Sequence, residues 1–111
     1  MRRIVRTQLE EIGFRDITDA EDGQSALRKM QQKDFNLIIS DWNMQPMSGL
    51  DFLKHIRGNK KYAKVPFIMV TAESKAENVQ EAKAAGVTNY IVKPFNSEML
   101  RKKIVASFAS A

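Results

Sequence analysis

The sequence predicts a single α/β domain over residues 1–111, with helices covering both faces of a parallel sheet. Three short apolar runs each stop at a reactive polar residue: 37–40 at Asp41, 67–70 at Thr71 and 90–92 at Lys93. The first two runs lack polar alternation, which is typical of strands that helices bury on both faces. Stretches with helical spacing separate the runs, and this alternation favours βαβ units and a parallel sheet.

The first half of the chain predicts two helices and two strands. Apolar spacing indicates a helix over Met1–Ile12, ended by Gly13, and a short strand over Phe14–Ala20. A second helix follows a turn and leads to the strand that ends at Asp41. Its inner face is expected to carry Ala26, Leu27 and Met30.

Capping patterns mark the later helices. Ser48 is expected to cap a third helix, because Asp51 lies three residues later as in a capping box. Ser74 and Glu77 repeat this spacing before a fourth helix that stops at Gly86. The expected core faces are Leu50, Leu53 and Ile56 in the third helix, Val79, Ala82 and Ala85 in the fourth, and Leu100, Ile104 and Phe108 in the fifth.

Composition narrows the function classes. A hydrophobic content of 43% and a charged content of 28% are typical of a globular domain. The chain has no Cys, and its one histidine, His55, excludes a histidine-based zinc site. No apolar stretch approaches the roughly 18 residues of a membrane span. A cytoplasmic location without membrane contact is therefore expected.

The net charge of +5 raises the question of a nucleic-acid partner. Arg2, Arg3 and Arg6 cluster near the start, but the lysines are scattered and no aromatic residues interleave with them to stack bases. We expect a solvated basic surface. A nucleic-acid binder, whose affinity would fall steeply with salt, ranks well below the other hypotheses.

The three polar residues predict a site at one edge of the sheet. In open α/β sheets ligands bind at the carboxyl ends of the strands, where Asp41, Thr71 and Lys93 would meet. A carboxylate at the end of a buried strand can accept a phosphoryl group. A hydroxyl and an ammonium group would stabilise the charge on the phosphoryl oxygens.

The stretches Ser40–Met44, Met69–Glu73 and Tyr90–Phe95 resemble the receiver domains of two-component response regulators. The resemblance covers essentially the whole chain and implies a flavodoxin-like parallel sheet. An ordinary enzyme with a diffusible substrate is disfavoured, because the sequence shows no nucleotide-binding glycine loop. The sequence departs from the family pattern after Met44. The family usually has Pro directly after this Met, whereas here Gln45 precedes Pro46. Only a local change in backbone shape is expected there.

The resemblance implies a role for each site residue. Asp41 would be the phosphoacceptor, Lys93 the cation that contacts the phosphate, Thr71 the switch hydroxyl, and Tyr90 the aromatic ring whose rotamer follows Thr71. The backbone carbonyl of Asn43 would bind Mg²⁺ together with Asp41, while the side chains of Asn43 and Glu73 would influence dephosphorylation. A histidine kinase is the implied input, and the implied output is a flagellar motor switch protein, as in chemotaxis.

The family pattern opens with a buried strand that ends in an acidic pair for Mg²⁺. This sequence begins within the first helix, so both features are expected to be missing and Mg²⁺ binding to be weak or lost, because Asp41 and one carbonyl supply few oxygen ligands. We expect rearrangement, dimerisation or strand exchange that fills the vacancy, or a chain that is a fragment of a longer product. Alternatively, Phe14–Ala20 would slide beside the strand at 37–41 and bring Glu21 and Asp22 to the reactive edge.

Two functional hypotheses remain from the sequence. The first is a phosphorylation-controlled switch in chemotaxis, impaired by the missing acids. The alternative is a metal-blind pseudo-receiver, a protein-interaction module in which Asp41 is not phosphorylated.

Overall fold

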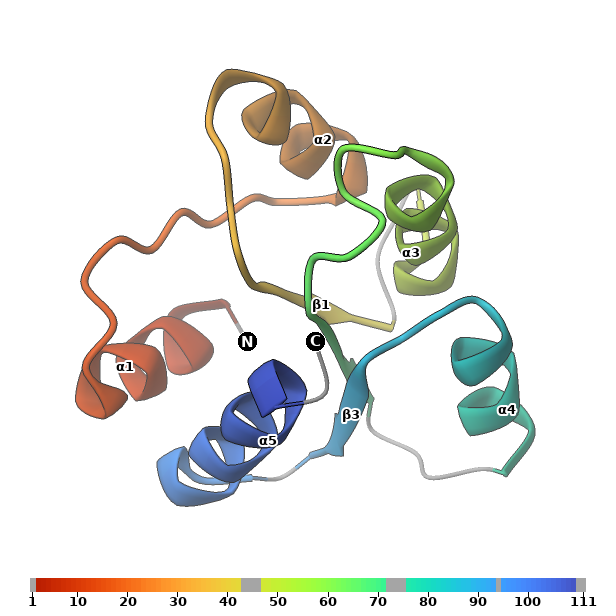
Figure 1. Cartoon of the computed structure of the whole chain (residues 1–111). Helices are drawn as coiled ribbons and strands as arrows, with labels where there is room; N and C mark the ends of the chain where they lie inside the picture. Colours follow the sequence, from red (N-terminus) through yellow and green to blue (C-terminus); the bar gives the residue numbers. More distant parts are fainter. Residues whose placement is uncertain (1, 43–46, 72–75, 94, 110–111) are drawn as a thin grey trace.

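A computed structural model describes residues 2–42, 47–71, 76–93 and 95–109. Three parallel strands form a sheet in the order β1-β2-β3, and helices surround it (Figure 1). The helices are α1 (Arg2–Ile12), α2 (Gly23–Gln32), α3 (Gly49–Gly58), α4 (Ala76–Ala84) and α5 (Ser97–Ala109), and the strands are β1 (Ile38–Asp41), β2 (Phe67–Thr71) and β3 (Asn89–Val92). None of the helices in these ranges is both long and apolar enough to cross a membrane.

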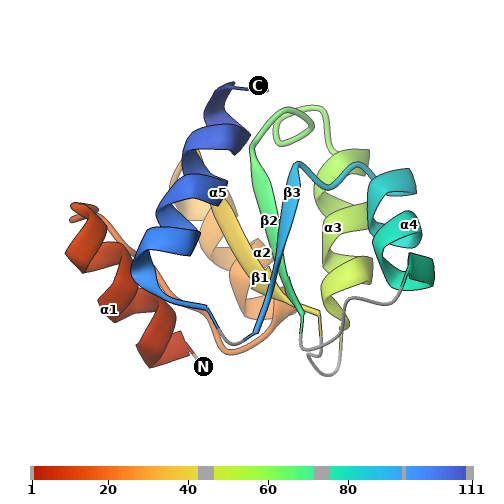
Figure 2. The same cartoon turned by 90° about the horizontal axis from the view of Figure 1, so that it is seen from below.

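The sheet separates two apolar clusters. Along β2, Phe67 and Met69 pack on one face with residues of α2 and α3, whereas Ile68 and Val70 pack on the other with residues of α1 and α5. Figure 2 shows α1 and α5 on one side of the sheet and α3 and α4 on the other. All five residues of β2 are buried, which confirms the prediction of a strand covered on both faces.

Most helix boundaries follow the expected signals. Gly13, directly after α1, and Gly86, two residues after the end of α4, adopt positive φ angles of 122° and 95°, as helix-terminating glycines do. The Ser48 side chain accepts a hydrogen bond from the backbone N–H of Asp51 at 3.1 Å, which confirms the expected cap of α3. Ser74 lies outside the described residues.

The expected core faces are partly corrected. Leu53, Ile56, Ala82, Leu100 and Ile104 are buried as expected. However, Phe108 is 41% exposed although it continues the spacing of Leu100 and Ile104, and the neighbouring Ser107 is buried in its place.

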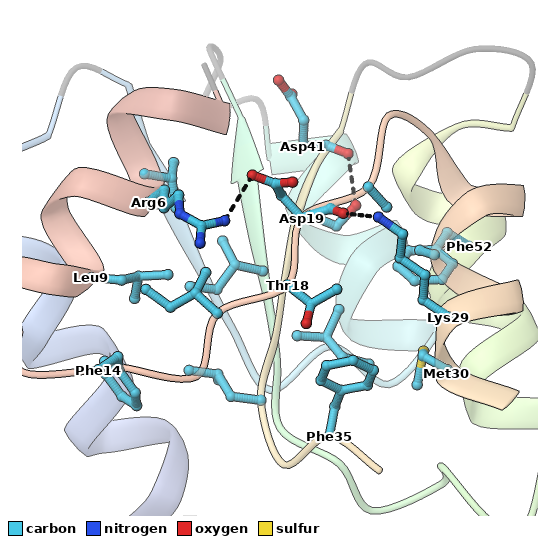
Figure 3. Close-up of a pocket in the computed structure, with 18 of the residues that line it drawn as sticks. Arg6, Leu9, Phe14, Thr18, Asp19, Lys29, Met30, Phe35, Asp41 and Phe52 are labelled. Atoms are coloured by element: carbon cyan, nitrogen blue, oxygen red, sulfur yellow. Dashed lines mark hydrogen bonds and ion pairs between the residues drawn. The ribbon is translucent and has the colours of Figure 1, made fainter. Parts of the chain in front are cut away.

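The prediction of a strand over Phe14–Ala20 is wrong. The segment has no regular secondary structure and takes no place in the sheet. A pocket lies between it and β1 (Figure 3), so none of the strands found in the described residues is close enough to form a ladder with it. Ionic contacts hold the segment instead: Asp19 pairs with Arg6 at 3.2 Å and Asp16 with Lys33 at 2.6 Å.

Arg57 joins several loops at the edge of the sheet opposite the strands' carboxyl ends. Its guanidinium group donates hydrogen bonds to the carbonyl oxygens of Gly86 and Val65, each at 2.7 Å, and to the hydroxyl of Thr88 at 3.2 Å. The same hydroxyl accepts the backbone N–H of Phe67 at 3.0 Å. Burial lowers the pKa of Arg57 below its ordinary value, but an arginine remains charged near neutral pH.

Candidate functional site

Asp41 and Lys93 meet at the carboxyl edge of the sheet. Asp41 is the last residue of β1, and the backbone N–H of Trp42 bonds to the carbonyl of Val70 at 2.8 Å, which aligns this end of β1 with β2. Lys93 directly follows β3. Its Nζ lies 2.9 Å from Oδ2 of Asp41, and the Asp41 side chain is only 16% exposed. A carboxylate and an ammonium group are therefore in direct contact in a partly buried setting.

Thr71 ends the strand that lies between these two residues. It is buried, it aligns with Val92 in the β2–β3 register, and its carbonyl accepts the backbone N–H of Lys93 at 2.8 Å. The strands therefore bring the three residues that the sequence singled out, Asp41, Thr71 and Lys93, to the same edge. Their chemical roles stay predictions.

Tyr90 lies three residues before Lys93, on β3. Its ring is half-buried, and Nζ of Lys103 in α5 lies 5.3 Å from the ring centroid. This distance is suitable for a cation–π contact. Asn43 and Glu73, the two residues expected to flank the site, lie outside the described residues.

Gly49 is a site-supporting residue that the sequence argument missed. It is buried at the start of α3, and a Cβ placed there would lie 2.1 Å from the carbonyl oxygen of Asp41 and 2.9 Å from Cα of Trp42. The backbone N–H of Gly49 also bonds to the carbonyl of Trp42 at 2.9 Å. The sequence does contain a signal for this close approach, because Gly49 takes the first helical position after the Ser48 cap and follows Asp41 closely in the chain.

Comparison with known proteins identifies the family. The sequence model of the protein family described as response regulator receiver domain matches residues 1–105 of this chain. The chain belongs to the response regulator receiver family. It is similar to the chemotaxis protein CheY-3 of Vibrio cholerae, with 44% identity over 104 residues that cover 94% of this chain and 80% of that protein. It is also similar to CheY of Pseudomonas aeruginosa, with 40% identity over 97% of this chain and 87% of that one.

Solved receiver structures have the same fold. CheY4 of Vibrio cholerae superposes with a TM-score of 0.87 at 41% identity, covering 94% of this chain and 86% of that one. A response regulator from Chloroflexus aurantiacus superposes with a TM-score of 0.91, covering 97% of this chain and 88% of that one. Its sequence identity is 21%, so this similarity shows the fold alone. The chain is thus a CheY-like receiver of the two-component type, and such receivers are signalling switches rather than classical enzymes.

Receiver domains of this family normally bind Mg²⁺, but the residues that the structure describes do not fit that ion. No group of three or more His, Cys, Asp or Glu side chains in these ranges is placed to hold a metal. The carboxylate of Asp41 is paired with Lys93.

The expectation that Glu21 and Asp22 reach the reactive edge as ligands of Mg²⁺ is also at odds with the structure. Asp22 caps α2, where its side chain accepts the backbone N–H of Ser25 at 2.8 Å. That hydrogen bond lowers the pKa of Asp22 below its usual range. The sliding movement that would have carried both acids to the reactive edge has not taken place, because residues 14–20 remain across the pocket from β1.

Proposed function

We propose that Asp41 accepts a phosphoryl group from a histidine kinase and that this modification controls a protein-binding surface in chemotaxis. The observation that carries the proposal is the 2.9 Å contact between Asp41 and Lys93 beside the end of β2. An oxygen of the Asp41 carboxylate attacks the phosphorus, and the bond between phosphorus and the kinase's histidine nitrogen breaks. The histidine leaves with the electron pair of that bond.

The residues around Asp41 support this transfer electrostatically. The ammonium group of Lys93 is close enough to exchange its carboxylate partner for a phosphoryl oxygen, where negative charge accumulates. The hydroxyl of Thr71 would donate a hydrogen bond to another phosphoryl oxygen. Because Thr71 is buried on the central strand, its movement would disturb the packing around β3.

The output surface of the proposal consists of α4, β3 and α5. CheY-like receivers interact with histidine kinases and with output proteins such as the flagellar switch, and we assign such a partner to this surface. Tyr90 would change its rotamer after Thr71 moves, and so leave its contact with Lys103. A partner that reads the rotamer of Tyr90 would then distinguish the two states.

A direct test uses a small phosphodonor. Acetyl phosphate with Mg²⁺ should add one phosphoryl group to the intact mass and change the fluorescence of Trp42, the only tryptophan. Asp41→Asn should abolish both signals, whereas Asp51→Asn, which changes an exposed aspartate on α3, should preserve them. Phosphorylation that persists in Asp41→Asn would contradict the assignment of the acceptor.

The alternative is a metal-blind pseudo-receiver that acts as a protein-interaction module. It is favoured by one observation, that the described residues include no three-ligand metal cluster. It predicts no mass change with acetyl phosphate and no Mg²⁺-dependent change in Trp42 fluorescence. The same experiment therefore separates the two functions.

A further inference from the structure

The excess positive charge of the chain is concentrated at the end of α3 and in the segment that follows it. Five of the 18 Lys and Arg residues lie within positions 54–64, and no Asp or Glu occurs from position 52 to position 72. The other 13 cationic residues equal the 13 acidic residues in number, so the net charge of +5 corresponds to this one segment. The lysines are therefore less evenly scattered than the sequence pattern indicated.

Two of the five cations are already used within the protein. Arg57 donates hydrogen bonds to backbone carbonyls of neighbouring loops, and Lys61 pairs with Asp34 at 3.5 Å. The remaining three are exposed and have no acidic partner within the described ranges: Lys54, Lys60 and Lys64. A helix dipole favours cations in its last turn, but Lys60 and Lys64 lie beyond the end of α3. Stabilisation of the helix therefore does not account for them.

Lys54 and Lys60 border an open groove of about 960 Å³ between α2 and α3 (Figure 1). The wall on α3 consists of positions 51, 54, 55 and 58, which have the spacing of one helix face. Gln24 lines the groove from the start of α2. The three unpaired lysines thus include two that belong to a hollowed surface with polar walls.

Charges are arranged in order along this groove. Asp51, in the first turn of α3, is the only carboxylate among the described residues that line it, whereas Lys54 and Lys60 lie toward its other end. Asp22, two residues before Gln24, is engaged in the cap of α2. The groove therefore runs from an acidic end to a basic end.

Neighbouring side chains distinguish between the anionic partners that a basic groove can bind. Tyr62, the aromatic residue of the basic segment, is only 7% exposed and lies beside the ammonium group of Lys61, so it offers no open ring for stacking nucleic-acid bases. The exposed large apolar residues of the described chain lie on α1 and α5, so a lipid surface would find no apolar anchor at the groove. A peptide fits better, because amide groups of the groove can bond to its backbone.

We propose that the groove between α2 and α3 binds an acidic peptide segment of a partner protein. Glutamate or aspartate side chains of the segment pair with Lys54 and Lys60, and a lysine or arginine at its other end pairs with Asp51. The side chain of Gln24 bonds to the peptide backbone between them. Asn59 adds a donor, because its Oδ1 accepts the backbone N–H of the residue two positions later and leaves its NH₂ group for the peptide. The order of the charges provides specificity.

The length of the probe follows from the helix. Asp51 and Gly58 lie roughly 10 Å apart along the axis of α3, which about three extended residues span. The probe is therefore the acetylated and amidated peptide Lys-Ser-Gly-Glu-Glu-Glu. One control replaces its glutamates with glutamine, and a second has the same composition in the order Glu-Glu-Ser-Lys-Gly-Glu.

The test titrates the isotope-labelled full chain with each peptide at low salt and follows the backbone amide signals by NMR. The probe should bind saturably and shift the signals of Gln24, Lys54 and Asn59. The glutamine peptide should not bind, and the reordered peptide should bind up to about fivefold more weakly, because its lysine no longer reaches Asp51. Asp41→Asn should bind the probe equally well, so the result is independent of whether Asp41 is phosphorylated.

Variants with matched charge locate the site on the protein. Lys54→Gln/Lys60→Gln should weaken binding roughly tenfold, because each lost ion pair weakens it by up to about fivefold. Lys83→Gln/Lys102→Gln removes the same charge from exposed positions on α4 and α5 and should leave the affinity unchanged. Conversely, Lys54→Glu/Lys60→Glu should reject the probe and bind a peptide in which lysines replace its glutamates.

Three results would overturn the proposal. Equal weakening by the two glutamine double substitutions would mean that the peptide responds to net charge and not to the groove. Equal affinity of the glutamine peptide would mean that charge pairing plays no part. A short oligothymidylate with three phosphates that displaces the probe and binds more tightly would mean that the groove serves a nucleic acid.

Discussion

Substitution of Gly49 by alanine tests how closely the chain packs against the backbone of Asp41. An added Cβ would lie 2.1 Å from the carbonyl oxygen of Asp41, whereas real contacts stay above 3.0 Å, so α3 or the end of β1 must move by at least 0.9 Å. Side-chain rotation cannot relieve this contact because the obstructing atom belongs to the backbone. The displacement therefore reaches the candidate phosphoacceptor itself.

The expected cost follows from two opposing effects. Overpacking of this kind typically costs about 1–3 kcal/mol, and alanine recovers at most about 1 kcal/mol over glycine in a helix. We expect Gly49→Ala to lower the free energy of unfolding by about 2 kcal/mol. With a urea m-value of about 1–3 kcal/mol/M, the unfolding midpoint followed by Trp42 fluorescence should fall by about 1 M.

Gly58→Ala is the matched control at the other end of α3. A Cβ there would meet no atom within 4 Å, so its midpoint should equal or exceed that of the parent chain. In addition, misplacement by about 1 Å can cost about a hundredfold in rate, so Gly49→Ala should also slow phosphorylation by acetyl phosphate. Equal midpoints for the two variants would refute the close packing on which this reasoning depends.

Three further predictions concern stability in urea. Arg57→Met should lower the free energy of unfolding by about 3 kcal/mol because several carbonyl groups lose a charged donor. Its control, Arg15→Met at an exposed position, should change the free energy of unfolding by less than about 0.5 kcal/mol. Ser48→Ala should cost about 1 kcal/mol through loss of the α3 cap. Asp22→Asn should be less stable than the parent at pH 7, because in the folded protein the hydrogen bond from Ser25 favours the ionised carboxylate and lowers its pKa. This difference should shrink as the pH falls below 3.8 and vanish once the pH passes the lower pKa of the folded state, where the carboxylate is protonated in both states.

The site was predictable where burial and chain direction were encoded locally. Apolar residues at 37–39 before Asp41 and at 67–70 before Thr71 indicated strands covered on both faces, and parallel strands place their ends at one edge. The contact between Asp41 and Lys93 follows from that arrangement, although 51 residues separate them in the sequence.

Features that depend on a distant partner were not predictable in the same way. Phe14–Ala20 has a plausible strand composition, but a strand exists only when another strand pairs with it, and a pocket separates this segment from β1. Gly49 and Arg57 act through backbone atoms of other elements, and backbone carbonyls leave no pattern in a sequence. Phe108 fits the helical spacing of α5, yet it is exposed while its neighbour Ser107 is buried, so the buried face near the end of the helix does not follow the apolar spacing.

The same apolar side chains that stabilise the sheet also determine the geometry of the site. Phe67 and Met69 face one cluster while Ile68 and Val70 face the other, so a slip of β2 by one residue would exchange the two sets between faces of different shape. That slip would also move Thr71 by about 3.3 Å along the strand and away from its bond to Lys93. The packing of β2 between two different apolar clusters therefore holds Thr71 beside Lys93, and repacking this strand should alter the proposed phosphoryl transfer even when Asp41 and Lys93 are unchanged.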